Sequence, residues 1–311
     1  MLSDSATVTS LRKPIAHVAI VALAFTALAL DCRRHTVLAQ RRDFLPMRAG
    51  HSTQGRTNNL PGIIFWAWER PEDLRFLNPG QDGVAFLAKT IYLPSPGVAP
   101  PETSPAEFIV RPRLQPLRIA PGTTLIAVAR IETPPLHAPV STTPAISPET
   151  RERIASEIAA LQNIPAVSAI QIDFDATSSQ HAFYSTLLQV VRRKLAPAIP
   201  LSITALASWC IGDRWLDQLP PDTIDEAVPM LFRMGPDSAS VARFLRAGEE
   251  FPVAACRDTL GLSTDEQVSH DLLTRRFAGM PAAWRQKRIY IFAPHAWTAS
   301  AANSILQEWQ P

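Results

Sequence analysis

The chain of 311 residues is long enough for one large domain or two ordinary ones. Apolar residues make up 46% of it and charged residues 19%, a globular composition that excludes a disordered chain. The formal net charge of +2 gives no basic footprint, so we expect no nucleic-acid partner.

The first 40 residues have the pattern of an export segment. A short basic region precedes an uncharged apolar run at residues 14–30. The pattern allows three outcomes: cleavage before Gln40, lipidation at Cys32, or retention as a single membrane anchor. We therefore assign residues 1–40 to a signal peptide or a membrane or lipid anchor. We expect an exported, periplasmic or envelope-associated protein, and membrane attachment through the N-terminus stays open.

Residues 41–60 are polar and irregular, and we predict that they form a linker before one domain at 61–311. Without the leader only Cys210 and Cys256 remain. An oxidising compartment would let them form a disulfide, but two buried free thiols fit the sequence as well. No Cys and His spacing typical of zinc sites is present, so we expect no metal and no cofactor.

From Pro61 onward, eight short apolar runs recur along the chain. Continuous runs of this kind are typical of strands that are buried on both faces. The predicted strands are residues 63–68, 84–93, 124–132, 169–174, 201–208, 227–234, 252–256 and 288–293.

Helical patterns alternate with these runs. Ser147 followed by Pro148 has the pattern of an N-cap and a first helical residue. The expected helices follow Ser147, span about 180–195, and cover 241–245, 272–277 and 305–309, whereas 108–117 is predicted to be extended. Strands and helices alternating over about 250 residues predict a single-domain α/β fold, a (β/α)8 TIM barrel. A doubly wound sheet is the alternative, but no glycine-rich phosphate-binding motif follows a strand.

The predicted C-terminal ends of the strands carry acids, arginines and tryptophans, and this is the end of a barrel where catalysis takes place. Tryptophan faces stack on sugar rings, while charged groups bind hydroxyls and transfer protons, so the mixture indicates a carbohydrate site. The candidate substrate-binding residues are Trp66, Trp68, Glu69, Arg130, Glu132, Gln171, Trp209, Asp213, Arg233, His295 and Trp297, with Arg257 and Asp258 at the predicted seventh strand. Taken singly, a tryptophan here is as well explained by core packing, and Arg130 by pairing with Glu132.

Asp173 and Asp175 are the candidate catalytic residues. They share one face of the predicted fourth strand with Gln171, whereas the apolar residues between them face the helices. Two acids about 6 to 7 Å apart along a strand raise each other's pKa, and a general acid needs a raised pKa. The alternative is that Asp175 caps the next helix and Asp173 pairs with an arginine such as Arg233.

Two resemblances extend this interpretation. Residues 170–175, "IQIDFD", resemble the strand-four motif of family-18-type glycoside hydrolases, the chitinases and their relatives. The resemblance implies that Asp173 orients the acetamido group of a substrate and that Asp175 is the acid. Residues 227–233 are similar to the strand-six element of that family, with Phe232 and Arg233 in place of its tyrosine and aspartate, and Trp297 is similar to the tryptophan after strand eight.

The second resemblance is to the bacterial domain-of-unknown-function family 3142, through segments such as "FWAWERPEDLRFL" and "PLSITALASWC", and it covers most of residues 61–298. It implies a barrel related to glycoside hydrolases. We expect a glycoside hydrolase-like enzyme that acts on an envelope or extracellular polysaccharide, with Asp175 as acid and Asp173 as polarising partner or nucleophile. Two carboxyl groups this close favour a reaction that retains the configuration at the anomeric carbon. The alternative function is a barrel that binds a glycan or an envelope partner without cleaving it.

Overall fold

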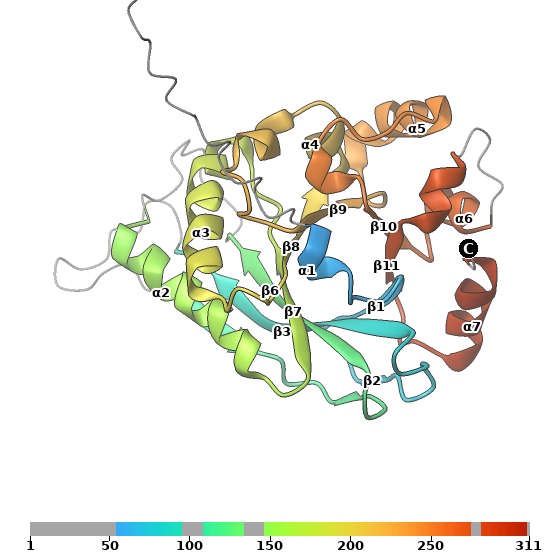
Figure 1. Ribbon diagram of the computed structural model, residues 1–311, viewed down its shortest axis with the longest axis horizontal. Helices are drawn as coiled ribbons and strands as arrows, with labels where there is room; N and C mark the ends of the chain where they lie inside the picture. The colour runs from blue at the N-terminus through green and yellow to red at the C-terminus, as the bar shows by residue number, and fades with distance from the viewer. Residues whose placement is uncertain (1–53, 95–107, 134–145, 275–280, 310–311) are drawn as a thin grey trace, which may run out of the picture. The chain divides into compact units, whose positions relative to one another are not determined.

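The computed structural model describes residues 54–94, 108–133, 146–274 and 281–309 (Figure 1). The chain divides into two compact units, 1–48 and 49–311, and all described residues belong to the second. The predicted export segment therefore lies outside the described residues. Among those that are described, no helix is both long and apolar enough to span a bilayer.

Eight parallel strands form a closed barrel. They are β1 (Ile63–Ala67), β3 (Asp82–Tyr92), β6 (Thr124–Glu132), β7 (Val167–Asp173), β8 (Leu201–Leu206), β9 (Glu226–Met230), β10 (Thr259–Ser263) and β11 (Arg288–Phe292). Each strand pairs with the next in this order, and β1 pairs with both β3 and β11, which closes the ring. Among the described residues, helices follow six of the eight strands, and the predicted (β/α)8 barrel is confirmed.

The helices around the barrel are α2 (Pro148–Ala159), α3 (His181–Lys194), α4 (Ala207–Ile211), α5 (Ser238–Ala247), α6 (Gln267–Leu273) and α7 (Ala299–Glu308). Short 3-10 helices lie in the same connections as the α-helices: η1 (Ala160–Asn163), η2 (Ser178–Gln180), η3 (Arg214–Gln218), η4 (Gly235–Asp237), η5 (Ala254–Cys256) and η6 (Ala282–Gln286). The α2 helix begins as predicted: Ser147 is its N-cap and accepts a hydrogen bond from the backbone N–H of Thr150 at 3.0 Å.

The first two connections of the barrel are irregular. Between β1 and β3 the chain forms the two-residue strand β2 (Glu72–Asp73), which pairs with β5 (Leu117–Arg118). In the described part of the next connection, β4 (Ile109–Pro112) lies antiparallel to β3 at its outer side. The predicted extended segment at 108–117 is thus confirmed.

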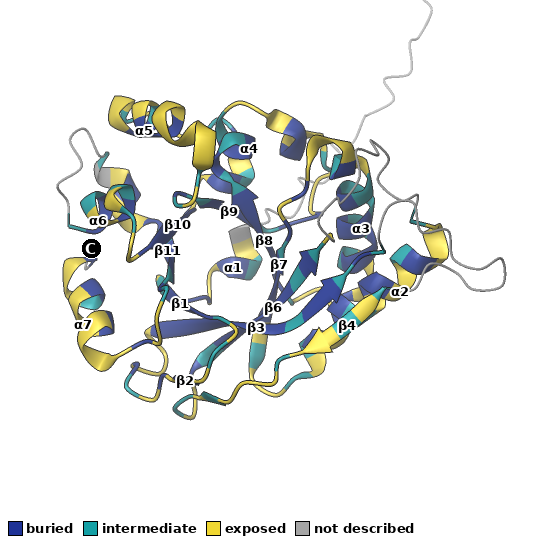
Figure 2. Ribbon diagram, turned by 180° about the vertical axis from the view of Figure 1, so that it is seen from behind, coloured by how far each residue is buried: buried dark blue, intermediate teal, exposed yellow. Residues whose placement is uncertain are grey.

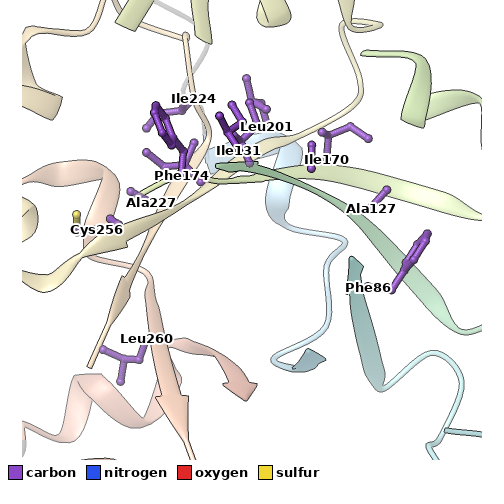
Figure 3. Packing of buried hydrophobic residues seen from close by; sticks show 14 of the residues in the cluster. Phe86, Ala127, Ile131, Ile170, Phe174, Leu201, Ile224, Ala227, Cys256 and Leu260 are labelled. Atoms are coloured by element: carbon purple, nitrogen blue, oxygen red, sulfur yellow. The ribbon is translucent and has the colours of Figure 1, made fainter. Parts of the chain in front are cut away.

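Side chains alternate between two hydrophobic layers. Inward residues such as Ile126, Val128 and Tyr290 fill the barrel. Outward residues pack against the helices in a larger layer, in which Ile170 and Leu201 lie side by side (Figure 3). Strand residues are therefore buried on both faces while the outer helix surfaces remain exposed (Figure 2). Each fully buried aliphatic side chain contributes about 1.5–3 kcal/mol, so this layering stabilises the frame that carries the strand ends.

The predicted seventh strand is wrong. Residues 252–256 form a turn and η5, and the strand is β10, residues 259–263. Its glycine explains why the sequence pattern is weak. A Cβ at Gly261 would lie 3.1 Å from the Pro229 carbonyl oxygen and 3.3 Å from the Trp66 ring, so the space inside the barrel is already taken. Arg257 and Asp258 consequently precede β10 and lie at the amino-terminal end of the barrel.

The amino-terminal end of the barrel is closed by residues that we assigned to the linker. Gln54–Thr57 form α1, and Figure 1 shows it over the centre of the barrel. Arg288 donates to the carbonyl oxygen of Thr57 at 2.7 Å and to Glu226 at 2.5 Å, and Arg56 pairs with Asp225 at 2.6 Å. Residues 54–60 are therefore part of the domain rather than a tether, because buried acids at the strand starts fix them.

Cys210 and Cys256 form a disulfide with a Cα–Cα distance of 5.9 Å. It joins α4, which follows β8, to η5, which precedes β10. Of the two states that the sequence left open, the bridged one is therefore found.

Candidate functional site

The site is a group of charged side chains at the carboxyl ends of β6 and β7. Arg130 and Asp173 are register partners on these neighbouring strands. Nε of Arg130 lies 3.0 Å from Oε1 of Glu132 and 3.7 Å from Oδ2 of Asp173. Thr204 on β8 donates a hydrogen bond of 2.7 Å to the other carboxylate oxygen, Oδ1. Inward alternation thus brings together Arg130, Glu132 and Asp173, as the sequence predicted.

Asp175 follows β7 by two residues, and its side chain is exposed. The next helical turn, η2, is capped by Thr177 through a capping box with Gln180. The alternative role of Asp175 as a helix cap is therefore wrong. The alternative for Asp173, pairing with an arginine, is found, but the arginine is Arg130 at 3.7 Å. The example that we named, Arg233, pairs with Asp265 at 3.0 Å instead.

Both acids hold protons more tightly than ordinary aspartates. Burial, followed by the charge of Asp175, raises the pKa of Asp173 to about 6, against the hydrogen bond from Thr204 and the charge of Arg130. The Asp173 side chain is 15% exposed, which is consistent with strong desolvation. Asp175 is exposed on one side, but the protein atoms packed around it desolvate its carboxylate and raise its pKa, again opposed by Arg130. A carboxyl group with a pKa near 6 is able to give and take a proton near neutral pH.

Aromatic side chains surround the opening of the barrel at the carboxyl-terminal ends of its strands, beside Asp173 and Asp175. We call this opening the mouth. The Phe232 and Phe292 rings stack with a centroid distance of 5.9 Å, and Trp68 meets Phe292 edge-on at 6.4 Å. Arginines lie over two of these rings: Arg130 over Trp68 at 5.6 Å, and Arg233 over Phe292 at 5.3 Å. The mouth therefore presents ring faces next to carboxylates, the combination that sugar binding uses.

Two arginines support this rim from behind. Arg113 donates to the carbonyl oxygens of Trp68 and Arg70, the latter at 2.7 Å. Arg70 in turn donates to the carbonyl oxygen of Ala293 at 2.7 Å and to Glu72 at 2.6 Å. Glu72 also accepts from the backbone N–H of Trp297 at 2.9 Å. These contacts join the end of β1 to the end of β11 and fix Trp68 at the rim.

Four predicted substrate-binding residues are buried in the core instead. Trp66 (2% exposed) fills the barrel and donates to Gln171, which is fully buried. Trp209 (3% exposed) packs among aromatic rings beside the disulfide, and Trp297 (5% exposed) packs edge-on against Phe65. Core packing, the alternative explanation for these tryptophans, is therefore the correct one, because each indole packs against other aromatic rings away from the surface.

The remaining candidates lie around the mouth without joining the acid cluster. Glu69 pairs with Arg111 of β4 at 3.2 Å. Asp213 and His295 are exposed in the loops after β8 and β11. Arg233 has a left-handed backbone with φ of 50°, which turns its guanidinium toward Asp265.

Thr204, Phe292, Arg70 and Arg113 were not identified from the sequence. Thr204 and Phe292 lie on the inward positions of predicted strands, so alternation was a signal that could have found them. Arg70 and Arg113 act through carbonyl groups of distant segments, and no local pattern indicates that.

The cavities in the described part of the molecule include four of about 690, 590, 370 and 110 Å³. The three larger ones are lined by residues at the amino ends of the strands, and none of the four is lined by Asp173 or Asp175. The candidate site is therefore defined by the arrangement of its charged and aromatic side chains and not by one of these cavities. Residues 95–107 and 134–145, which follow β3 and β6, lie outside the described residues. Among the described residues no cluster of three or more metal-binding side chains is found.

The fold and this cluster define a TIM-barrel protein with a carboxylate, arginine and aromatic site at its carboxyl-terminal mouth. Residues 124–228, from β6 into β9, match the family described as Domain of unknown function (DUF3142), which confirms the resemblance over that stretch. No curated protein matches the chain.

A search of solved structures finds similarity to the chitinase domain of the spore coat protein CotE from Clostridium difficile. The identity is 14% and the TM-score 0.37, and the match covers 75% of this chain. The chain spans 65% of that domain, just under two thirds of its length. The fold is defined by the pairing of the strands in the barrel.

Proposed function

We propose that the chain is an exported carbohydrate-active protein, a glycoside hydrolase-like enzyme that acts on an envelope or extracellular polysaccharide. One observation carries the proposal. Two acids with raised pKa values, Asp173 and Asp175, lie beside a ring of aromatic side chains at the catalytic end of a closed barrel.

The roles follow from exposure and proton affinity. Asp175 is exposed and able to reach a bound glycan, so it acts as general acid toward the glycosidic oxygen. Asp173, with a pKa of about 6, is held by Thr204 and Arg130, and it either polarises its neighbour or attacks the anomeric carbon as nucleophile while Asp175 protonates the leaving oxygen. Residues two apart leave little room for a water between them, which favours a retaining reaction. Trp68, Phe232 and Phe292 contact the sugar faces.

A barrel that binds a glycan without cleaving it is the second candidate. Arg130 lies within ion-pair distance of both Glu132 and Asp173, and its charge opposes the rise in the pKa of Asp173 and Asp175 that a general acid needs. Phe232 and Arg233 occupy the positions of the hydroxyl and carboxylate partners in the family-18-type element.

The two candidates are separated by hydrolysis and binding assays on a panel of bacterial exopolysaccharides and chitin-type oligomers. The wild type is compared with Asp175→Asn and with Asp265→Asn, which removes an arginine-paired acid at the same mouth. Hydrolysis by the wild type and by Asp265→Asn, with loss of at least 100-fold in Asp175→Asn, supports the enzyme. Binding without turnover supports the second candidate, and equal turnover in Asp175→Asn contradicts the assignment of the acid.

Export is part of the proposal and has its own test. The Cys210–Cys256 disulfide suits an oxidising compartment and supports it. Cell fractionation followed by intact-mass analysis of the mature chain distinguishes an N-terminus at Gln40 from a lipidated Cys32 or an uncleaved anchor. Recovery of the full-length chain from the cytosol alone would contradict export.

A further inference from the structure

The cavity of about 590 Å³ lies at the amino-terminal end of the barrel, away from Asp173 and Asp175. Its walls come from the start of β1, the turn before β3, η6 and α7. The volume falls within the range of about 300–1,000 Å³ that small-molecule sites occupy. None of the residues that line this cavity belongs to the mouth, so the proposed function gives it no role.

Among the described residues that line the cavity, Asp82 is the only acid. It is the first residue of β3 and is 4% exposed. Its Oδ2 accepts a hydrogen bond of 2.8 Å from the backbone N–H of Asn78, which closes the turn before the strand. The other oxygen, Oδ1, has no hydrogen-bond partner within the described part of the chain. A carboxylate that is more than nine-tenths buried therefore has only one of its two oxygens satisfied.

No cation of the described residues pairs with the Asp82 carboxylate. Burial raises its pKa, and the hydrogen bond from Asn78 opposes the rise, whereas no neighbouring charge contributes. Two cations line the same cavity, but Lys287 pairs with Glu250 at 2.8 Å and Arg285 is exposed to solvent. Because buried charges are normally paired, the carboxylate at this cavity points to a cation that comes from a ligand.

Apolar side chains form another part of the cavity wall. Phe76 and Ile63 are half-buried beside it, and Leu306 and Trp309 reach it from α7 and the residue that follows. Such walls bury the hydrocarbon part of a ligand. The cavity therefore combines one buried, unpaired carboxylate with apolar surface, the combination that suits an amine with a hydrocarbon group.

We propose that this cavity binds a small organic amine, with its ammonium group paired with Asp82 and its hydrocarbon part against Phe76 and Leu306. The ammonium donates to Oδ1 while Oδ2 keeps its hydrogen bond from Asn78, so binding satisfies the carboxylate without opening the turn. A neutral hydroxyl would satisfy the oxygen but leave the buried charge unpaired, so the site selects a cation. The inference goes beyond the proposed function, and amine binding here and glycan hydrolysis at the mouth are measured separately.

The test compares two probes of similar shape, benzylammonium and its neutral counterpart benzyl alcohol. Each is titrated into nitrogen-15-labelled protein at pH 7, and the backbone N–H signals of Asn78, Gly80 and Gln81, in the turn around the carboxylate, report binding. Benzylammonium should shift these signals and bind about 10-fold more tightly than benzyl alcohol. The absence of a shift with benzylammonium, or equal affinity for the alcohol, overturns the proposal.

Two variants assign the effect to one side chain. Asp82→Asn keeps the shape and an oxygen that accepts from Asn78, but it removes the charge, so the preference for benzylammonium should disappear. Asp222→Asn is the matched control, because Asp222 lines another cavity, of about 370 Å³, at the same end of the barrel. The control should bind both probes as the wild type does. An unchanged preference in a folded Asp82→Asn protein, or the same loss in Asp222→Asn, overturns the proposal.

Discussion

The hydroxyl of Thr204 on β8 donates a hydrogen bond of 2.7 Å to Oδ1 of Asp173 on β7. This bond stabilises the charged carboxylate and opposes the burial that raises its pKa to about 6. Thr204→Val keeps the shape and removes the donor, so we expect the pKa of Asp173 to rise further. The acidic limb of the pH–rate profile, or the midpoint of a carbon-13 NMR titration of the aspartate carboxyl groups, should move to higher pH. A fall in that midpoint would contradict the assigned contact.

Asp173 should lower the stability of the protein at neutral pH. Its folded pKa of about 6 lies above its ordinary value of 3.8. Its favourable contribution is therefore complete below about pH 4 and is lost as the pH rises through about 6. The difference amounts to at most about 3 kcal/mol above pH 7. Asp173→Asn should accordingly be more stable than the wild type at pH 8 by about 1–3 kcal/mol.

The advantage of Asp173→Asn should shrink toward zero near pH 4, because both side chains are then neutral. Urea unfolding at a series of pH values measures it, with Asp265→Asn as the matched control. The pKa of Asp265 is lowered by Ser263 and Arg233, so that substitution should destabilise at pH 8. The same stability difference for both variants would mean that the proton affinity of Asp173 is not the cause.

The barrel and the place of its acids were predictable from the sequence because strands buried on both faces leave continuous apolar runs. The seventh strand was missed because Gly261 makes room for the Trp66 ring, and this space is visible only in three dimensions. Residue type alone also misplaced the tryptophans. Trp66 and Trp209 are of the residue type that stacks on sugars, but both lie in the core. Trp68, in contrast, is held at the mouth by Arg113, which is distant in the sequence.

Trp68 should contribute to glycan binding. Its indole lies under the guanidinium of Arg130 and beside Phe292 at the mouth. Trp68→Ala should weaken oligosaccharide binding about 10-fold, equivalent to about 1.4 kcal/mol, while the fold is retained. Calorimetric titration measures the effect. Phe76→Ala is the control, because Phe76 is a half-buried aromatic residue that lines a cavity at the amino-terminal end of the barrel. An equal loss of binding affinity in both variants would contradict a role of the mouth in glycan binding.

The disulfide should contribute strongly to stability. Cys210 and Cys256 are 46 residues apart, and closing a loop of this length stabilises the folded state by about 4 kcal/mol in the chain-entropy model. The double variant Cys210→Ser/Cys256→Ser should lose about that free energy of unfolding in urea. A reducing agent should destabilise the wild type and leave the variant unaffected. Labelling of two free thiols in the non-reduced, unfolded wild type would show that the bridge is absent.

Arg288 should be essential for the closed end of the barrel. It pairs with the buried Glu226 at 2.5 Å and donates to the carbonyl oxygen of Thr57. Arg288→Met leaves Glu226 buried with only the hydrogen bond from Tyr290, which should cost about 3–5 kcal/mol. In the double variant with Glu226→Met, most of that loss should be recovered in thermal or urea unfolding. If the double variant recovers no stability, the loss is due to the broken contacts between Arg288 and the segment that contains α1.

Because α1 is held at the amino-terminal end of the barrel, the polypeptide enters this domain on the side away from Asp173 and Asp175. An affinity handle placed ahead of Gln54 is therefore joined to the rigid domain at the face opposite the acids. Surface-immobilised protein attached by such a handle should keep its mouth open to long glycan chains. The same geometry means that a cell attachment through this end would direct the mouth outward, toward polymer that is not on the same surface.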